Sequence, residues 1–259
     1  MWKQPWCWMV GHPMRCCWNC SPNMVRARSC ISDMGAWVHD IDVWVFDLDD
    51  TLYDARTDIF PQIDARMTGY MSGMLGLSWD RANMLRKQYW AEFGATLHGL
   101  RQVHGLCPVI FTKNTHDIDY SSLMPCGRTN QYLQKLPGRK IIFTNGPRGH
   151  AAKVLEQRGM SNIFADIFTI EDTGFRPKPD PHGYERILRH LDVPASRVAM
   201  FEDSEQNLAT AKALGLKTLH VGTSSLHDWD RRDDQLTGHL AWLHLQLDAG
   251  AHAPHDIRA

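Results

Sequence analysis

The strongest constraint on the fold is a series of short apolar runs that alternate with helical segments. The runs are rich in β-branched and aromatic residues, which is typical of strands buried on both faces. Strands that alternate with helices form a parallel sheet covered by helices on both sides. We therefore expect an α/β fold with a Rossmann-like, doubly wound parallel sheet. Its strands should cover residues 41–46, 140–143, 167–170, 198–201 and 218–221.

The connection between the first two strands is much longer than a crossover needs. It contains about 88 residues of mostly helical sequence, whereas one helix would be enough. We therefore expect an all-helical cap domain at 57–137, inserted after the first strand of a core formed by 39–56 and 138–248. Helices are expected at 58–74, 78–93, 148–159, 182–191, 205–214 and 235–247.

The first residues differ in composition from the rest of the chain. Five of the seven cysteines and four of the ten tryptophans precede Met34, in a stretch with no helical or strand period. We expect 1–38 to be an unstructured extension, or the working translation start to be Met34, and we expect 249–259 to be a tail. A zinc site built on Cys17 and Cys20 is an alternative, but the second ligand pair that such sites use is missing.

Charge and hydropathy exclude several classes of function. The formal net charge is −1, from 28 Lys and Arg against 29 Asp and Glu, so nothing points to a nucleic-acid polymer as partner. No apolar run is long enough for a membrane span. The residues after the extension do not call for an oxidising compartment. We expect a cytoplasmic protein, either a monomer or a homodimer, in which most of the scattered histidines are solvated.

Polar residues follow three of the predicted strands directly. A lysine between two prolines precedes the fourth strand as well. The carboxyl ends of parallel strands meet at one edge of the sheet, so these side chains should converge there. The set consists of Asp47, Asp49, Thr144, Asn145, Lys178, Glu202 and Asp203.

This set of side chains suits a divalent cation and a phosphate group. Asp47 and Asp203 offer the oxygen ligands that Mg²⁺ prefers, and two carboxylates as close as Asp47 and Asp49 would repel each other without a cation. Asp47 could act as a nucleophile and Asp49 as a general acid and base. Charge on the transferred phosphoryl group would be neutralised by Lys178, Thr144 and Asn145.

Four motifs in this order resemble the haloacid dehalogenase (HAD) superfamily of phosphohydrolases. They are Asp47-Leu48-Asp49-Asp50-Thr51-Leu52, Ile141-Ile142-Phe143-Thr144-Asn145-Gly146, Arg176-Pro177-Lys178-Pro179 and Glu202-Asp203. The resemblance implies that Asp47 is the nucleophile and Asp49 the general acid and base. It also implies that Mg²⁺ is held by Asp47, the Asp49 backbone carbonyl and Asp203. Glu202 is a possible further ligand, and the phosphate would lie against Asn145, Gly146 and Lys178.

Further segments look like the pyrimidine 5′-nucleotidase branch of that superfamily. They are 47–53, 59–64, 93–100 and 136–140. This resemblance implies a Mg²⁺-dependent phosphomonoesterase that converts UMP or CMP to nucleoside and phosphate through an aspartyl-phosphate intermediate. Candidate residues for contacting the base are Tyr120, His98, His116 and Arg128.

Three alternatives remain open at this point. The first is an HAD phosphatase or phosphomutase acting on another small phosphate ester, such as a sugar phosphate, because the cap selects the substrate. The second is a haloalkanoate dehalogenase, which shares the nucleophile but does not need Asp49 or the metal-binding acids. The third is a non-catalytic binding protein on the same fold, which the intact set of polar residues disfavours.

Overall fold

The structure is a computed structural model that describes residues 35–56, 58–223 and 227–251, with side chains described up to residue 249. The described residues from Ala36 onward belong to one compact unit. The predictions for residues 1–34 and 252–259 lie outside the described residues. Among the described helices, none combines the length and the apolar character that crossing a membrane requires.

The core is a six-stranded sheet in the order β3-β2-β1-β4-β5-β6, with every neighbouring pair parallel. The expected parallel α/β architecture is therefore confirmed. Phe46 at the end of β1 aligns with Ile142 of β2 and Phe201 of β4. The strands are β1 (Val43–Phe46), β2 (Arg139–Phe143), β3 (Asp166–Phe168), β4 (Val198–Glu202), β5 (Lys217–Val221) and β6 (Arg231–Asp233).

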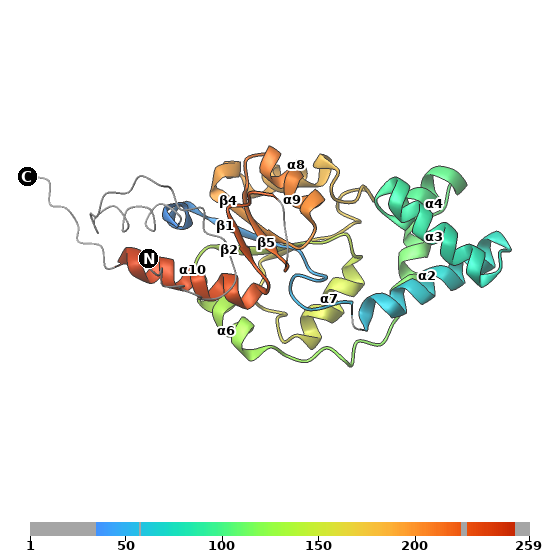
Figure 1. The fold of residues 1–259 in the computed structure, drawn as a ribbon, viewed down its shortest axis with the longest axis horizontal. Helices are drawn as coiled ribbons and strands as arrows, with labels where there is room; N and C mark the ends of the chain where they lie inside the picture. Colours follow the sequence, from blue (N-terminus) through green and yellow to red (C-terminus); the bar gives the residue numbers. More distant parts are fainter. Residues whose placement is uncertain (1–34, 57, 224–226, 252–259) are drawn as a thin grey trace, which may run out of the picture. The chain divides into compact units, whose positions relative to one another are not determined.

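Helices cover both faces of the sheet (Figure 1). Successive residues of a strand point to opposite faces, so Val43 and Val45 pack in one hydrophobic cluster and Trp44 and Phe46 in the other. The first cluster includes α8 (Pro181–Leu191) and α9 (Glu205–Ala213). The second includes η1 (Ala36–Asp40), α6 (Gly127–Lys135), α7 (Arg148–Gln157) and α10 (Leu236–Ala251), while η2 (Ala195–Arg197) leads into β4.

Four helices of the insertion have a hydrophobic cluster of their own. It contains Met71, Tyr89, Leu100 and Phe111. These helices are α2 (Ile59–Leu75), α3 (Trp79–Phe93), α4 (Thr96–His104) and α5 (Pro108–Thr115).

The fifth helix of the insertion, α6, belongs to the sheet layer. Its Leu133, and Leu136 just after it, are buried in the cluster that contains Trp44 and Phe46. Its neighbour there is α10, as Figure 1 also shows. The expected cap boundary at residue 137 is thus too late, because an amphipathic pattern does not say which surface a helix covers.

Two further boundaries differ from expectation. The folded unit begins before residue 39, since Val38 is only 1% exposed and Trp37 packs against Trp242 with ring centroids 6.1 Å apart. α10 continues to Ala251, beyond the expected end at 247 and into the expected tail. The short strand β6 was not predicted, because Arg231-Arg232-Asp233 has no apolar run.

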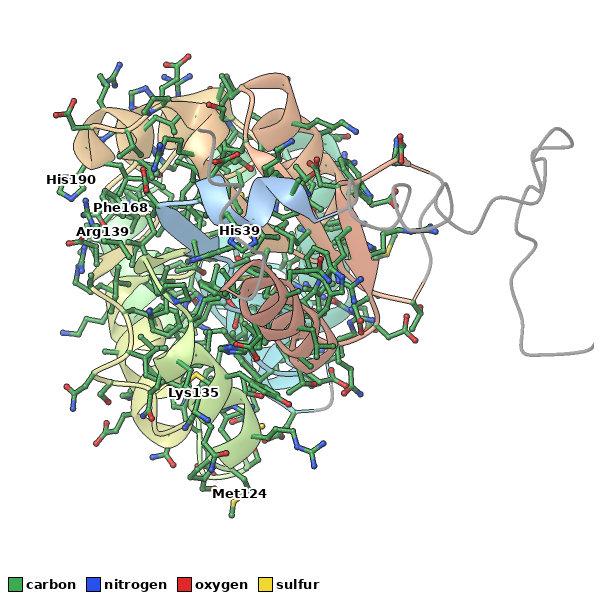
Figure 2. All side chains as sticks on the ribbon, turned by 90° about the vertical axis from the view of Figure 1, so that its left-hand side faces the viewer. His39, Met124, Lys135, Arg139, Phe168 and His190 are labelled. Atoms are coloured by element: carbon green, nitrogen blue, oxygen red, sulfur yellow. The ribbon has the colours of Figure 1, made fainter. Side chains whose placement is uncertain are left out.

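The outer edge of the sheet at β3 carries charged and aromatic side chains. Arg139, Phe168 and His190 lie at this edge in Figure 2. Arg139 pairs with Asp166 at 2.9 Å, and the Phe168 and His190 rings contact edge to face with centroids 5.0 Å apart. Charges along an edge strand disfavour pairing with another chain.

Candidate active site

A buried ion-pair network lies where β1 and β4 end. Asp47 follows β1 directly, and its backbone N–H donates to the Phe201 carbonyl of β4 at 2.9 Å. The Lys178 ammonium donates to Asp47 Oδ1 at 2.6 Å, to Glu202 Oε2 at 2.7 Å and to the Phe143 carbonyl at 2.9 Å. Asp47, Lys178 and Glu202 are all buried, so one ammonium balances two carboxylates away from water.

The electrostatics of this network show an excess of negative charge. Burial raises the pKa of the Asp47 carboxyl well above its usual value, and nearby Glu202 raises it further against the opposing effect of Lys178. Burial, and then Glu202, raise the pKa of Asp203 to about 7. Burial alone would lower the pKa of Lys178, but the charges of Asp47 and Glu202 outweigh it and raise that pKa.

The carboxylates of Asp47, Glu202 and Asp203 form a candidate cation site. Asp47, Glu202 and Asp203 each offer an oxygen, and the three oxygens lie within 4.8 Å of one another. Hard divalent cations such as Mg²⁺ take oxygen ligands, and a cation would relieve the repulsion that raises the pKa of Asp47 and Asp203. The donor set therefore fits Mg²⁺, and it includes Glu202 as well as the two expected aspartates.

The residues after β2 shape the loop that carries Lys178. Asn145 Oδ1 accepts the Lys178 backbone N–H at 2.7 Å, and its Nδ2 donates to the Lys178 carbonyl at 3.1 Å. Asn145 was expected to donate to the phosphate, but here its side chain holds the lysine backbone. Buried Thr144 accepts the Gly146 backbone N–H at 2.8 Å, which closes the turn after β2.

Asp49 is held by two side chains that were not predicted for the site. Its Oδ1 pairs with His150 Nε2 at 2.8 Å and accepts a short hydrogen bond from the Tyr53 hydroxyl. Burial would raise the pKa of Asp49, but the nearby His150 and the Tyr53 hydrogen bond outweigh it and lower that pKa. His150 lies in the first turn of α7, directly after β2, and this position was the one signal in the sequence that could have identified it.

The candidate base-contacting residues lie in different places. Tyr120 is buried, with its hydroxyl against His150 Nδ1 at 2.9 Å and the His116 carbonyl at 3.0 Å. Burial, and then His150, lower the pKa of His116 to about 4. Arg128 is exposed on α6, and His98 is partly buried on α4. Tyr120 and His116 thus both contact the His150 ring.

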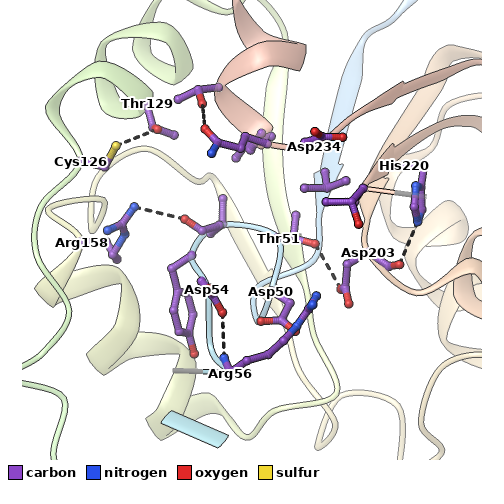
Figure 3. Close-up of a pocket in the computed structure, with 18 residues that line it drawn as sticks. Asp50, Thr51, Asp54, Arg56, Cys126, Thr129, Arg158, Asp203, His220 and Asp234 are labelled. Atoms are coloured by element: carbon purple, nitrogen blue, oxygen red, sulfur yellow. Dashed lines mark hydrogen bonds and ion pairs between the residues drawn. The ribbon is translucent and has the colours of Figure 1, made fainter. Parts of the chain in front are cut away.

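A pocket of about 570 Å³ lies beside the acidic cluster (Figure 3). Asp203 belongs to both, and Thr51 donates to Asp203 Oδ1 at 3.4 Å within the pocket wall. Asp47, Thr144 and Lys178 do not line this pocket. Arg56, Arg158 and Cys126 line its other sides, so it has a mixed charge.

Comparison with known proteins agrees with this geometry. Residues 41–215 match the family of haloacid dehalogenase-like hydrolases, a span that contains β1 to β4 and all of the motif residues. The chain belongs to that family.

Individual relatives of this hydrolase match shorter segments. It is 30% identical over 105 residues to the sesquiterpene phosphatase astK of Aspergillus oryzae, covering 39% of this chain and 53% of the relative. It is 31% identical over 87 residues to a phosphorylated carbohydrates phosphatase of Thermotoga maritima, covering 34% and 40%.

The solved structures similar to this hydrolase show its fold. An HAD phosphatase from Thermococcus onnurineus has a TM-score of 0.54 at 20% identity, covering 78% of this chain and 98% of that one. The HAD hydrolase YfnB from Bacillus subtilis, bound to magnesium, has a TM-score of 0.52 at 17% identity with coverage of 78% and 98%. By contrast, the matched segments span about half the length of the curated relatives or less.

Proposed function

We propose that this hydrolase is a Mg²⁺-dependent phosphomonoesterase with Asp47 as its nucleophile. The observation that carries the proposal is the buried network of Asp47, Lys178 and Glu202, with Asp203 completing a three-carboxylate cluster. A nucleophile at the end of a buried strand, with an ammonium 2.6 Å away, is placed where a phosphoryl group can be received and its charge balanced.

The chain's own residues account for both halves of the reaction. An Asp47 oxygen attacks phosphorus while the ester P–O bond breaks, and Asp49, which takes part in this step in its protonated form, gives its proton to the leaving oxygen. Water then attacks the aspartyl-phosphate and transfers a proton to Asp49, which releases phosphate and restores Asp47. Lys178 and Thr144 balance charge on the phosphoryl oxygens, and Asn145 keeps Lys178 in place. Mg²⁺, held by Asp47, Asp203, Glu202 and the Asp49 backbone carbonyl, would supply charge neutralisation when bound.

Within this class we propose pyrimidine nucleoside 5′-monophosphates as substrates. Support comes from the resemblance of 47–53, 59–64, 93–100 and 136–140 to the pyrimidine 5′-nucleotidase branch. A sugar phosphate or phosphoglycolate is the second candidate, favoured by the names of the phosphatases that the chain resembles.

We propose that α2–α5 act as the cap that selects the substrate. Arg101 of α4 donates to the carbonyls of Gly174 at 3.2 Å and Phe175 at 2.9 Å, in the loop that precedes Lys178. Phe175 also packs in the hydrophobic cluster of α2–α5. These contacts join the inserted helices to the loop that carries the catalytic lysine.

A substrate panel tests both levels of the proposal. Phosphate release is measured from UMP, CMP, AMP, glucose 6-phosphate and phosphoglycolate, with Mg²⁺ and with EDTA. We expect hydrolysis that requires Mg²⁺ and is lost in Asp47→Asn, with kcat/KM highest for UMP or CMP. A preference for a sugar phosphate or phosphoglycolate would replace the nucleotide assignment. Activity that survives EDTA or Asp47→Asn would overturn the mechanism.

A further inference from the structure

We propose that His150 is a positioning residue for Asp49, supported from behind by Tyr120, and that it leaves Asp49 Oδ2 as the oxygen that exchanges protons with the substrate. This inference rests on the proposed phosphomonoesterase function. It assigns a role to a buried histidine that the mechanism above does not use.

The two oxygens of Asp49 have different surroundings. Oδ1 is taken by His150 Nε2 at 2.8 Å and by the Tyr53 hydroxyl. Oδ2 lies near the turn after β2, because a methyl group added at Gly146 would be 2.9 Å from His150 Cδ2, 3.2 Å from Thr144 Oγ1 and 3.6 Å from Oδ2. Both of these hydrogen bonds thus go to Oδ1, and Oδ2 lies near the turn after β2, which also contains Thr144, one of the residues assigned to the phosphoryl group.

The His150 ring is itself fixed in place. It is 1% exposed, and both of its nitrogens have partners, since Nδ1 lies 2.9 Å from the Tyr120 hydroxyl. Tyr120 contacts the His116 carbonyl as well, and its ring packs under the Lys153 ammonium at 5.3 Å. A ring flip would break the contacts of both ring nitrogens, which favours the observed arrangement of Asp49, His150 and Tyr120.

Such an arrangement matters for proton transfer. A carboxylate with no partners rotates freely, and a general acid that is misplaced by a fraction of an ångström loses much of its effect. General acid catalysis contributes about 10²- to 10⁴-fold to a rate. That contribution is largest for esters whose leaving oxygen is strongly basic and small for esters whose leaving group departs without a proton.

The test measures kcat/KM for a series of phosphate monoesters from 2,4-dinitrophenyl through phenyl to methyl phosphate. kcat/KM reports the step in which the leaving group departs, so it isolates the acid role of Asp49. In His150→Leu we expect a loss of about 10²-fold with phenyl and methyl phosphate and under about threefold with dinitrophenyl phosphate. His150→Gln should recover most of the loss, because its side-chain amide can still donate a hydrogen bond to Asp49.

Control variants distinguish a role of His150 in positioning Asp49 from a general effect on folding. His239 is also fully buried, but in α10, where its Nε2 meets the His220 carbonyl at 2.8 Å, so His239→Leu controls for the loss of a buried ring. We expect that control to lower stability without changing the dependence on the leaving group. If His150→Leu does not fold, Tyr120→Phe removes one hydroxyl only and should show the same selective loss at about 3- to 10-fold.

The outcomes distinguish this inference from the function on which it rests. Suppose that Asp49→Asn loses activity mainly with phenyl and methyl phosphate, as expected. The positioning role of His150 is then overturned if the His150 and Tyr120 variants lose activity equally with all esters, or lose none. If Asp49→Asn shows no selective loss either, the acid role of Asp49 fails together with the inference. If the wild-type protein hydrolyses none of the esters, the proposed function itself fails.

Discussion

At the scale of single residues, the site is governed by unequal numbers of buried charges. Lys178 is the buried cation that contacts both Asp47 and Glu202, and it holds these carboxylates at 2.6 and 2.7 Å. Removing one partner of a buried ion pair leaves a charge without compensation, which costs far more than breaking a pair at the surface. Lys178 is therefore expected to contribute to stability as well as to catalysis.

Lys178→Met should lower the free energy of unfolding by about 3 to 5 kcal/mol at neutral pH and abolish phosphatase activity. The reason is that Asp47 and Glu202 would then face each other without an ammonium. Urea unfolding followed by circular dichroism measures the change. Arg139→Met, which removes the half-exposed pair with Asp166, is the control and should cost under about 1 kcal/mol. Equal costs for the two variants would contradict this view of Lys178.

At the scale of elements, close packing between helices and strands decides which glycines can be changed. Gly183 of α8 lies against β2, and an added methyl group would be 2.8 Å from Phe143 Cζ and 3.0 Å from Thr173 Cγ2. Gly149 in the first turn of α7 is exposed and has no neighbour within 4 Å of such a methyl group. Both helices pack on the same sheet, but only Gly183 is required by close packing.

Gly183→Ala should therefore destabilise the protein by about 1 to 3 kcal/mol, because the extra methyl group overpacks α8 against Phe143. Gly149→Ala should be neutral or stabilising by up to about 1 kcal/mol, because alanine loses less backbone entropy in a helix. Thermal unfolding of the two single variants makes the comparison. A stable Gly183→Ala variant would show that α8 can move away from the sheet at little cost.

At the scale of the whole molecule, stability should depend on pH through histidines that fold in their neutral form. Burial lowers the pKa of His239 to about 4, against the opposing effect of its hydrogen bond to the His220 backbone. Its Nε2 meets the His220 carbonyl, and its Nδ1 has no partner among the described residues, so a second N–H would be left without an acceptor.

The sign follows from proton linkage. Below about pH 6.5 the unfolded chain protonates His239 while the folded chain does not, so the free energy of unfolding falls as the pH drops from 6.5 toward 4. His239→Gln should flatten this dependence by up to about 3 kcal/mol, measured by urea unfolding at several pH values. His190→Gln, at a half-exposed site, should leave the dependence nearly unchanged. The same slope in both variants would contradict a neutral, buried His239.

Mg²⁺ should also stabilise the folded protein, because the cluster of Asp47, Glu202 and Asp203 exists only in that state. At about 100 times its dissociation constant the cation would add about 2.7 kcal/mol. We expect Tm to rise with Mg²⁺ in the wild type and the rise to be mostly lost in Asp203→Asn. Asp192→Asn, which changes an exposed carboxylate at the end of α8, should keep the full rise. A rise unaffected by Asp203→Asn would place the cation elsewhere.

The sequence alone determined the parallel sheet and the convergence of the motif residues, because buried strands are continuous apolar runs and the ends of parallel strands meet at one edge. Asp47, Lys178, Glu202 and Asp203 follow that rule, and the structure brings them together.

Only the tertiary structure decided which side chains surround Asp49. His150 lies 101 residues after Asp49 along the chain, and Tyr120 lies 30 residues before His150. No local periodicity relates positions that far apart. The same holds for α6, whose amphipathic pattern is satisfied equally by the inserted helices or by the sheet. A sequence motif identifies residues that are close together in the chain, whereas the partners of a buried polar group are determined by how distant segments pack.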